Sequence, residues 1–311
     1  MKLLGFLIAL SVAILWYAPQ FGAEALNELE PDVASAIMDL RLPRTAIAWL
    51  AGGALAICGA VLQTLLRNGL ATPFTLGVSS AASFGAFLVL AFPALELAGS
   101  PRPLALLFAI LELLLVVGWA RRSRRADGLI LAGVTFNFLF AALMMLVRYL
   151  ADPYRLASMD RWLMGSLDIV GWETPTSLIP WLVIGIGLIF WKTRDLDFLA
   201  FDPELAKTRG VNVQATRRHL LFATGLLTAA VVAHTGPIGF IGLLVPHAIR
   251  PFTGMRHGLL LPASFLAGGS FLVLADTLAR SLELLGRHSE MPVGILTALC
   301  GAPLFLLLLR K

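Results

Sequence analysis

Residues 46–66 read AIAWLAGGALAICGAVLQTLL and contain no charged side chain. A transmembrane α-helix needs roughly 20 consecutive, mostly apolar residues, so this stretch is long enough to cross a bilayer. Comparable apolar runs recur along the chain at Leu3 to Ala18, Pro103 to Ala120, Leu129 to Val147 and Leu259 to Leu274. The sequence therefore predicts an integral membrane protein with several spans.

The composition agrees with a core that is packed in lipid. Of the 311 residues, 58% are hydrophobic and 14% are charged, whereas soluble domains carry roughly 45–50% apolar residues. The net charge of +5 first reports membrane orientation in a protein of this kind, so we expect no nucleic-acid partner. Cys58 and Cys300 lie inside apolar runs, which predicts packing residues rather than a disulfide or a CxxC site.

The apolar runs, read in order, predict an all-α fold, a polytopic transmembrane helical bundle of about ten helices in a single domain, residues 1–311. One helix should be short and broken near 237–246, because Pro237, Pro246 and the glycines between them interrupt it. Irregular backbone at membrane depth is tolerated only where protein or water satisfies it. The expected helices are 2–21, 43–66, 73–92, 103–120, 129–148, 175–191, 218–234, 239–254, 259–283 and 293–309.

Lysine and arginine are distributed unequally between the two sides that these helices define. Ten crossings place both termini on one side, and that side collects about twice as many basic residues as the other. The positive-inside rule then predicts that both termini are cytoplasmic. The basic residues on that side are Lys2, Arg67, Arg121, Arg122, Arg124, Arg125, Lys192, Arg194, Lys207, Arg209, Arg217, Arg218, Arg250, Arg256, Arg310 and Lys311.

The N-terminus has two interpretations. Lys2 and the apolar run to Ala18 resemble a secretory signal peptide, with a passable cleavage site at Gly22-Ala23. We favour an uncleaved first helix, because the remaining chain is hydrophobic enough to need no separate signal. Whether the N-terminus is processed stays open.

A basic loop over residues 192–218 has more local signals than a connector needs. Asp202 can cap a helix that starts at Pro203, and Gly210 can end it, which predicts a short helix at about 203–209. An apolar patch rimmed by charge usually marks an interface, so we favour partner docking over a solvated connector. The apolar residues of the loop are Phe198, Leu199, Phe201 and Leu205.

The chain carries no familiar catalytic motif. GxxxxGK[ST], HExxH and GxSxG are all absent from the sequence, so neither nucleotide hydrolysis nor a hydrolase site is indicated. The five histidines are dispersed without paired ligand spacing, so no metal site is predicted. We therefore expect a chain that is not an enzyme and that holds no cofactor.

Several short motifs occur together and in a fixed order. They are RLPR at 41–44, GALAICGAVLQ at 53–63, RN at 67–68, LGVSS at 76–80, WLMGSL at 162–167, AKTRGV at 206–211, GPIGFIGLLVPH at 236–247, LAD at 274–276, AR at 279–280, PVG at 292–294 and GAP at 301–303. The set spans nearly the whole chain and resembles the FecCD family, the permease subunits of type II ABC importers for iron chelates, haem and cobalamin. Gly69 and Ala81 depart from the family pattern, which usually has proline and glycine there.

The resemblance implies a set of partners. Two ten-helix permeases, identical or paralogous, pair with two cytoplasmic ABC ATPases that bind ATP and Mg. A periplasmic or lipid-anchored substrate-binding protein presents acidic residues to permease arginines. The implied location is the bacterial inner (cytoplasmic) membrane.

The resemblance also assigns residues to docking. It implies that Arg41, Arg44 and Arg280 receive the binding protein, since a guanidinium recognises a carboxylate in a bidentate geometry. The alternative is structural: Arg44 extends from a helix end toward water, and Arg280 pairs with Asp276 at i, i+4.

Coupling and translocation residues follow from the same resemblance. The coupling segment, at about 195–217, offers to the ATPase Asp202, Glu204, Leu205, Lys207, Arg209, Gly210 and Val211. The translocation path is expected along the fifth helix and the short helix after it, with Thr135, Asn137, Met144 and Met164. Core packing is an alternative for the methionines. Glu112, an isolated acid at membrane depth, invites a functional hypothesis but is equally compatible with a protonated structural carboxyl group.

The overall prediction is the permease subunit of a binding-protein-dependent ABC importer that moves an iron chelate, a ferric siderophore first, into the cytoplasm. Haem or cobalamin is the alternative cargo. A proton-coupled secondary transporter is a further alternative, but it needs an internal inverted repeat that the sequence does not show. An intramembrane enzyme would need a nucleophile and a base, and no such pair is present. The sequence does not name the chelate.

Overall fold

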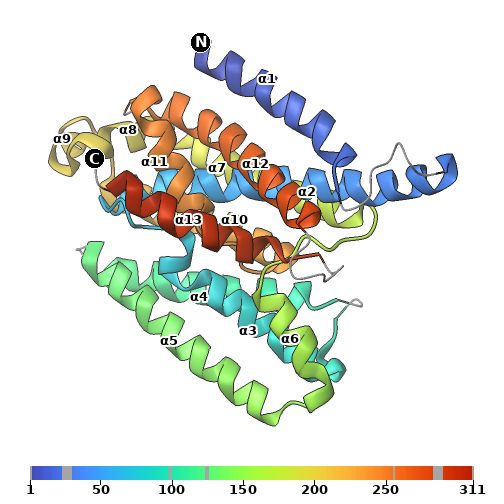
Figure 1. Cartoon of the computed structure of the whole chain (residues 1–311). Helices are drawn as coiled ribbons and strands as arrows, with labels where there is room; N and C mark the ends of the chain where they lie inside the picture. The colour runs from blue at the N-terminus through green and yellow to red at the C-terminus, as the bar shows by residue number, and fades with distance from the viewer. Residues whose placement is uncertain are drawn as a thin grey trace.

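The computed structural model describes residues 2–22, 30–97, 100–122, 126–254, 256–282 and 290–309 (Figure 1). Over these ranges the chain is helical, with thirteen α-helices and no strand longer than the single bridge between Leu97 and Ser100. The all-α prediction is confirmed. The helices are α1 Lys2–Tyr17, α2 Pro31–Leu65, α3 Val78–Ala91, α4 Arg102–Arg122, α5 Ala126–Leu150, α6 Leu156–Leu163, α7 Glu173–Trp191, α8 Thr193–Phe201, α9 Pro203–Thr208, α10 Val213–Thr235, α11 Ile241–Thr253, α12 His257–Ser281 and α13 Val293–Leu309.

Ten of these helices correspond to the ten that the apolar runs predict, and α6, α8 and α9 are additional short helices. In the described part of the chain, six helices are long and apolar enough to cross a membrane by length and composition. They cover Lys2–Gln20, Pro31–Leu65, Arg102–Trp119, Gly128–Leu150, Glu173–Trp191 and His257–Ser281.

Two predicted boundaries differ most from the structure. The second helix begins at Pro31 rather than at 43 and continues through Pro43, because an interior proline in a membrane helix can be tolerated when neighbouring groups satisfy the freed carbonyl. The irregular backbone expected across 237–246 is confined to 236–240, where Gly236 and Phe240 have positive φ angles. Pro246 lies inside α11.

Helix α2 is the centre of the bundle and is buried along most of its length. It packs antiparallel to α12 at Gly52 and Gly268, where the backbones approach so closely that a Cβ on either glycine would collide with the opposite helix. Gly59 makes a similar contact with Gly242 of α11. Small residues allow such approaches in lipid.

The antiparallel α2–α12 pair has a polar contact at each end. Arg44 of α2 lies beside Asp276 of α12, and Thr64 of α2 lies beside His257 of α12. Twenty residues of α-helix span about 30 Å, which matches the hydrocarbon thickness of a bilayer. We call these the Arg44 end and the His257 end. Figure 1 shows α8 and α9 at one end of the bundle and α6 at the other.

Helix α5 lies at the margin of the bundle (Figure 1) and exposes large apolar side chains. Phe138, Met145 and Tyr149 have exposed fractions of 73%, 71% and 85%. The opposite face of α5 contributes Phe140 and Val147 to a small cluster with α3 and α6. The exposed face is therefore available for lipid or for another subunit.

Candidate functional site

Arg44 is nearly buried in α2, and one edge of its guanidinium is held by α12. Its Nε lies 3.0 and 3.1 Å from the two carboxylate oxygens of Asp276, and its Nη2 lies 2.9 Å from Asp276 Oδ1. Parallel N–H···O bonds of this kind are strong and geometrically specific. Asp276 thus fixes the orientation of Arg44.

The remaining edge of Arg44 meets two further acids. Nη1 donates to Asp168 Oδ1 at 3.2 Å and also to Glu290 Oε2. Asp168 lies in the loop after α6, and Glu290 lies in the segment before α13. Their side chains are 52% and 48% exposed, against 10% for Arg44.

Arg280 completes this group of charges, which we call the Arg44 cluster: Arg44, Asp168, Asp276, Arg280 and Glu290. Arg280 Nε lies 3.1 Å from Asp276 Oδ2, a close ion pair that lacks hydrogen-bond geometry. The structural alternative for Arg280, a pair at i, i+4, is therefore present. Arg280 also donates to the carbonyls of Phe21 and Ala18, and Arg41 donates to that of Pro19. Two of the three arginines assigned to docking, Arg41 and Arg280, thus also hold the turn that follows α1.

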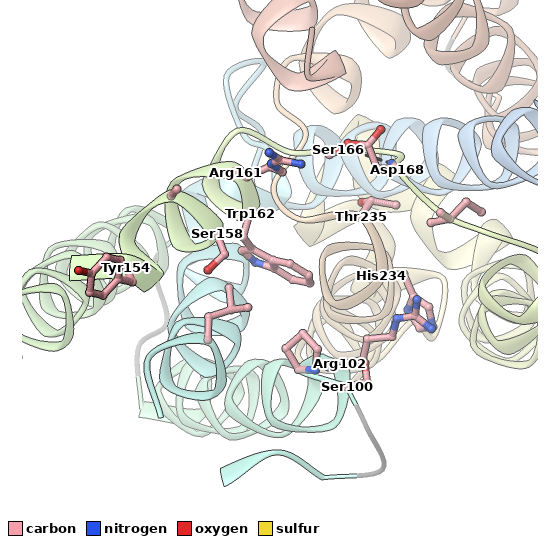
Figure 2. Close-up of a pocket in the computed structure, with 14 residues that line it drawn as sticks. Ser100, Arg102, Tyr154, Ser158, Arg161, Trp162, Ser166, Asp168, His234 and Thr235 are labelled. Carbon is pink, nitrogen blue, oxygen red and sulfur yellow. Dashed lines mark hydrogen bonds between the residues drawn. The ribbon is translucent and has the colours of Figure 1, made fainter. Parts of the chain in front are cut away.

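Two cavities open at the Arg44 end. The larger, about 750 Å³, lies between α6, the start of α4 and the end of α10 (Figure 2). Its labelled polar residues include Arg102 and His234, which are bonded to Thr174 and Ser177 respectively. The smaller, about 560 Å³, is lined by Ala157, Asp160, Arg161, Met164, Asp168, Glu290 and Pro292. The predicted path residue Met164 and two members of the Arg44 cluster therefore share one cavity.

The other predicted path residues lie on α5. Thr135 is exposed, and its hydroxyl donates a hydrogen bond to the carbonyl of Leu131. Asn137 is held inside the subunit, since its Nδ2 donates to the carbonyl of Phe74 at 2.9 Å. Met144 packs against the cluster formed with α3 and α6. Their part in translocation stays a prediction.

Glu112 is fully buried in α4. Neither of its carboxyl oxygens has a hydrogen-bond partner among the described residues, and Oε1 lies close to Gly77. An unpaired ionised carboxylate would be very costly at this depth. The geometry therefore favours the protonated structural carboxyl group.

In the described ranges, no three His, Cys, Asp or Glu side chains gather as a metal site.

The predicted capped helix is present at the His257 end. Asp202 Oδ1 accepts hydrogen bonds from the backbone N–H groups of Glu204 and Leu205, and α9 ends before Gly210, whose φ is +81°. Glu204 pairs with Lys207 at 2.7 Å on the exposed surface. The helix prediction over about 203–209 is confirmed. The exposed apolar side chains of α8 and α9 are Phe198, Phe201 and Leu205.

A buried histidine ties this surface to the centre of the bundle. His257 Nδ1 lies 2.7 Å from Asp197 Oδ1 of α8, and its Nε2 lies 2.9 Å from Thr64 Oγ1 of α2. The backbone N–H of His257 donates to the same Asp197 oxygen at 2.7 Å. Sequence reasoning missed this link, because no spacing rule connects residues that are so far apart in the chain.

Six described helices that are long and apolar enough to cross a membrane, with cavities at both ends of the bundle, fit a multi-span membrane permease. The family model of the FecCD transport family matches residues 1–311. The chain belongs to the FecCD transport family and is an ABC importer permease.

Curated relatives match over most of their length. The cobalamin import system permease protein BtuC of Halobacterium salinarum is 39% identical, over 96% of this chain and 79% of its own length. The molybdate import system permease protein MolB of Haemophilus influenzae is 37% identical, over 91% and 83%. The hemin transport system permease protein HmuU of Yersinia pestis is 36% identical, over 99% and 95%.

A solved structure agrees in fold over the whole chain. It is described as an inward-facing conformation of a candidate metal-chelate type ABC transporter, with 34% identity and a TM-score of 0.89. The match covers 100% of this chain and 99% of that chain. The bundle is therefore the helical fold of this permease class.

Proposed function

We propose that the chain is the translocating subunit of a binding-protein-dependent importer for an iron chelate, with a ferric siderophore as the first candidate. The observation that carries the proposal is that one helix pair, α2 with α12, joins two opposite ends of the bundle that offer different surfaces. The Arg44 end offers guanidinium groups, and the His257 end offers the α8–α9 surface. A separate ATPase would drive transport, with ATP and Mg bound there.

The cargo is inferred from similarity and from the space at the Arg44 end. The similar solved structure is described as a metal-chelate type, and ligand pockets for small molecules usually enclose about 300–1,000 Å³. The cavity beside Met164, about 560 Å³, falls in that range. Haem and cobalamin remain alternatives because relatives are named for them. A single small oxyanion, the cargo named for another relative, would underfill this space.

Docking of the binding protein is proposed at the Arg44 end, with Arg41, Arg44 and Arg280 as the receiving residues. This end would face the periplasm of a bacterial inner membrane, which places both termini in the cytoplasm according to the positive-inside rule. Carboxylates on the binding protein would supply the complementary charge.

Coupling to the ATPase is proposed at α8 and α9. Leu205 and Val211 would supply apolar contacts, with Glu204, Lys207 and Arg209 at the rim, while Asp202 and Gly210 fix the shape of the turn. The Asp197–His257–Thr64 chain of contacts joins α8 to α12 and α2. A push on α8 would therefore move the α2–α12 pair as a unit, as alternating access requires.

The path is proposed to run between two permease subunits, either identical or paralogous, along the exposed face of α5 and along α6. Thr135, Asn137, Met144 and Met164 are the proposed residues of the path, with Thr135 and Met164 at its exposed surface and Asn137 and Met144 behind that surface, against the 73–76 turn and α3. Large apolar side chains on α5 are already exposed in one subunit, which suits burial against a second one.

The test is uptake by proteoliposomes that contain the permease, its ATPase and the binding protein that stimulates that ATPase. Radiolabelled ferric siderophore is compared with haem, cobalamin and molybdate, with and without ATP inside the vesicles. We expect ATP-dependent uptake of the iron chelate. Uptake of cobalamin or molybdate alone would refute the iron-chelate cargo. Accumulation of solute by the permease alone would refute ATPase-driven import and favour the proton-coupled alternative.

A further inference from the structure

Arg44, which is proposed to receive the binding protein, already pairs with carboxylates of its own chain. Arg44 has a side chain that is 10% exposed, and each of its three guanidinium nitrogens contacts a carboxylate of the same chain. Within the Arg44 cluster, two guanidinium groups face three carboxylates. A carboxylate that approaches from outside therefore meets a guanidinium whose nitrogens are already paired with carboxylates of the same chain. A carboxylate of the binding protein can therefore bind Arg44 only after a resident carboxylate has moved away.

The three carboxylates are not equivalent. Asp276 is 1% exposed, lies within the regular helix α12 and binds the Nε and Nη2 edge of Arg44. Asp168 and Glu290 are about half exposed, lie in non-helical segments and bind only Nη1. The outward-facing edge of Arg44 is thus held by the two acids that can move away into water most easily.

We propose that Asp168 and Glu290 occupy the site of the binding protein's carboxylate, and that docking replaces one or both of them on Arg44. The proposal rests on the proposed docking at Arg44 and names what that docking must displace. Because one carboxylate replaces another, the buried guanidinium is paired before and after the exchange, and the large cost of an unpaired buried charge is avoided.

The exchange has a mechanical consequence, because the displaced acids belong to two segments that meet there. The backbone N–H of Gly294, in the first turn of α13, donates to the carbonyl of Gly165, which follows α6, at 3.1 Å. The N–H of Ser166 donates to the carbonyl of Thr235 at the end of α10, at 3.0 Å. Arg44 therefore fastens both sides of the α6–α13 junction through Asp168 and Glu290.

The same junction borders the cavity of about 560 Å³, whose lining includes Asp168, Glu290 and Met164. Release of the two acids from Arg44 removes the charged tether between the loop after α6 and the segment before α13. The wall of the cavity would thereby be loosened only while the binding protein is docked. The tether then couples delivery of the cargo to opening at the Arg44 end.

The first test compares the affinity of the cargo-free binding protein for the nanodisc-reconstituted importer and for the variants Asp168→Asn, Glu290→Gln and their combination. We expect the double variant to bind about tenfold more tightly, which is the equivalent of about 1.4 kcal/mol, because no resident carboxylate competes for Nη1. The matched control is Asp160→Asn, since Asp160 lines the same cavity but pairs with Arg148. The control should bind as the wild type does.

The second test follows backbone hydrogen exchange in peptides that cover 163–170 and 290–297. We expect faster exchange at Ser166 and Gly294 in wild type with the binding protein bound, and in the double variant without it. Unchanged or weaker binding by the double variant would overturn the proposal that docking replaces carboxylates on Arg44. Hydrogen exchange that docking leaves unaltered would also overturn it. Arg41→Glu separates it from the docking proposal: if that variant leaves affinity unchanged, docking at this end fails, whereas weakened binding upholds docking.

Discussion

Asp276 is the residue whose removal has the clearest expected cost. Its carboxylate is 1% exposed and lies between two arginines, with Arg44 at 2.9 Å and Arg280 at 3.1 Å. Asp276→Asn keeps the volume of the side chain and removes its charge. Arg44 retains Asp168 and Glu290, so the loss falls mainly on Arg280, which is 4% exposed.

The magnitude follows from the burial of Arg280. Removing one partner of a buried ion pair costs about 3–5 kcal/mol, and we expect a value near 3 kcal/mol because Arg280 still donates to the carbonyls of Phe21 and Ala18. At about 2 °C per kcal/mol for a chain above 200 residues, the melting temperature should fall by about 6 °C.

The assay is a thermal-shift or size-exclusion measurement of the purified permease in detergent at a fixed heating rate. Asp160→Asn is the control, because the Arg148–Asp160 pair is partly exposed, with side chains 46% and 35% accessible, and exposed pairs contribute only about 0–1 kcal/mol. The combination of Asp276→Asn with Arg280→Gln should recover part of the loss, since it removes the stranded charge. The reasoning would be refuted if Asp276→Asn had the melting temperature of the wild type. It would also be refuted if the double variant had a lower melting temperature than Asp276→Asn alone.

Three further predictions concern the His257 end and the core. Exchanging the charges of Glu204 and Lys207 should leave basal ATPase activity intact and lower binding-protein-stimulated hydrolysis several-fold; wild-type stimulation would argue against coupling there. Asp197→Asn should reduce uptake per ATP hydrolysed, because it weakens the link through His257; an unaltered ratio would show that α8 does not transmit the motion. Glu112→Gln should leave uptake at the wild-type level and the melting temperature within about 2 °C of wild type, the equivalent of about 1 kcal/mol, since an amide replaces a neutral carboxyl group; a large loss in either would indicate an ionised, functional carboxylate.

Local features of the fold could be predicted from the sequence because they depend on neighbours in the chain. The cap at Asp202 and the i, i+4 pair of Asp276 with Arg280 are set by helix geometry alone, and both are present. Helix α8 was missed because Lys192, Arg194, Asp195 and Asp197 made 192–201 read as a charged loop. The structure shows that Asp195 and Asp197 instead bond Thr216 and His257.

The candidate sites were predictable only in part. Arg41, Arg44 and Arg280 could be chosen from motifs, but their surroundings could not. Nothing in the sequence indicated that Arg44 would be closed in by Asp168 and Glu290, which lie 124 and 246 residues away. Asn137 was chosen as a polar residue in a span, and its bond to Phe74 depends on how α5 packs against the 73–76 turn.

The sequence by itself determined that the chain enters a bilayer as helices, since partition into lipid and helix formation depend on the apolar content and hydrogen bonds of each segment alone. The tertiary structure alone decided which charges meet at the ends of those helices. Contacts such as Arg44 with Asp276 depend on the crossing of the close-packed helices α2 and α12, and apolar stretches of similar composition do not encode which helices will be neighbours.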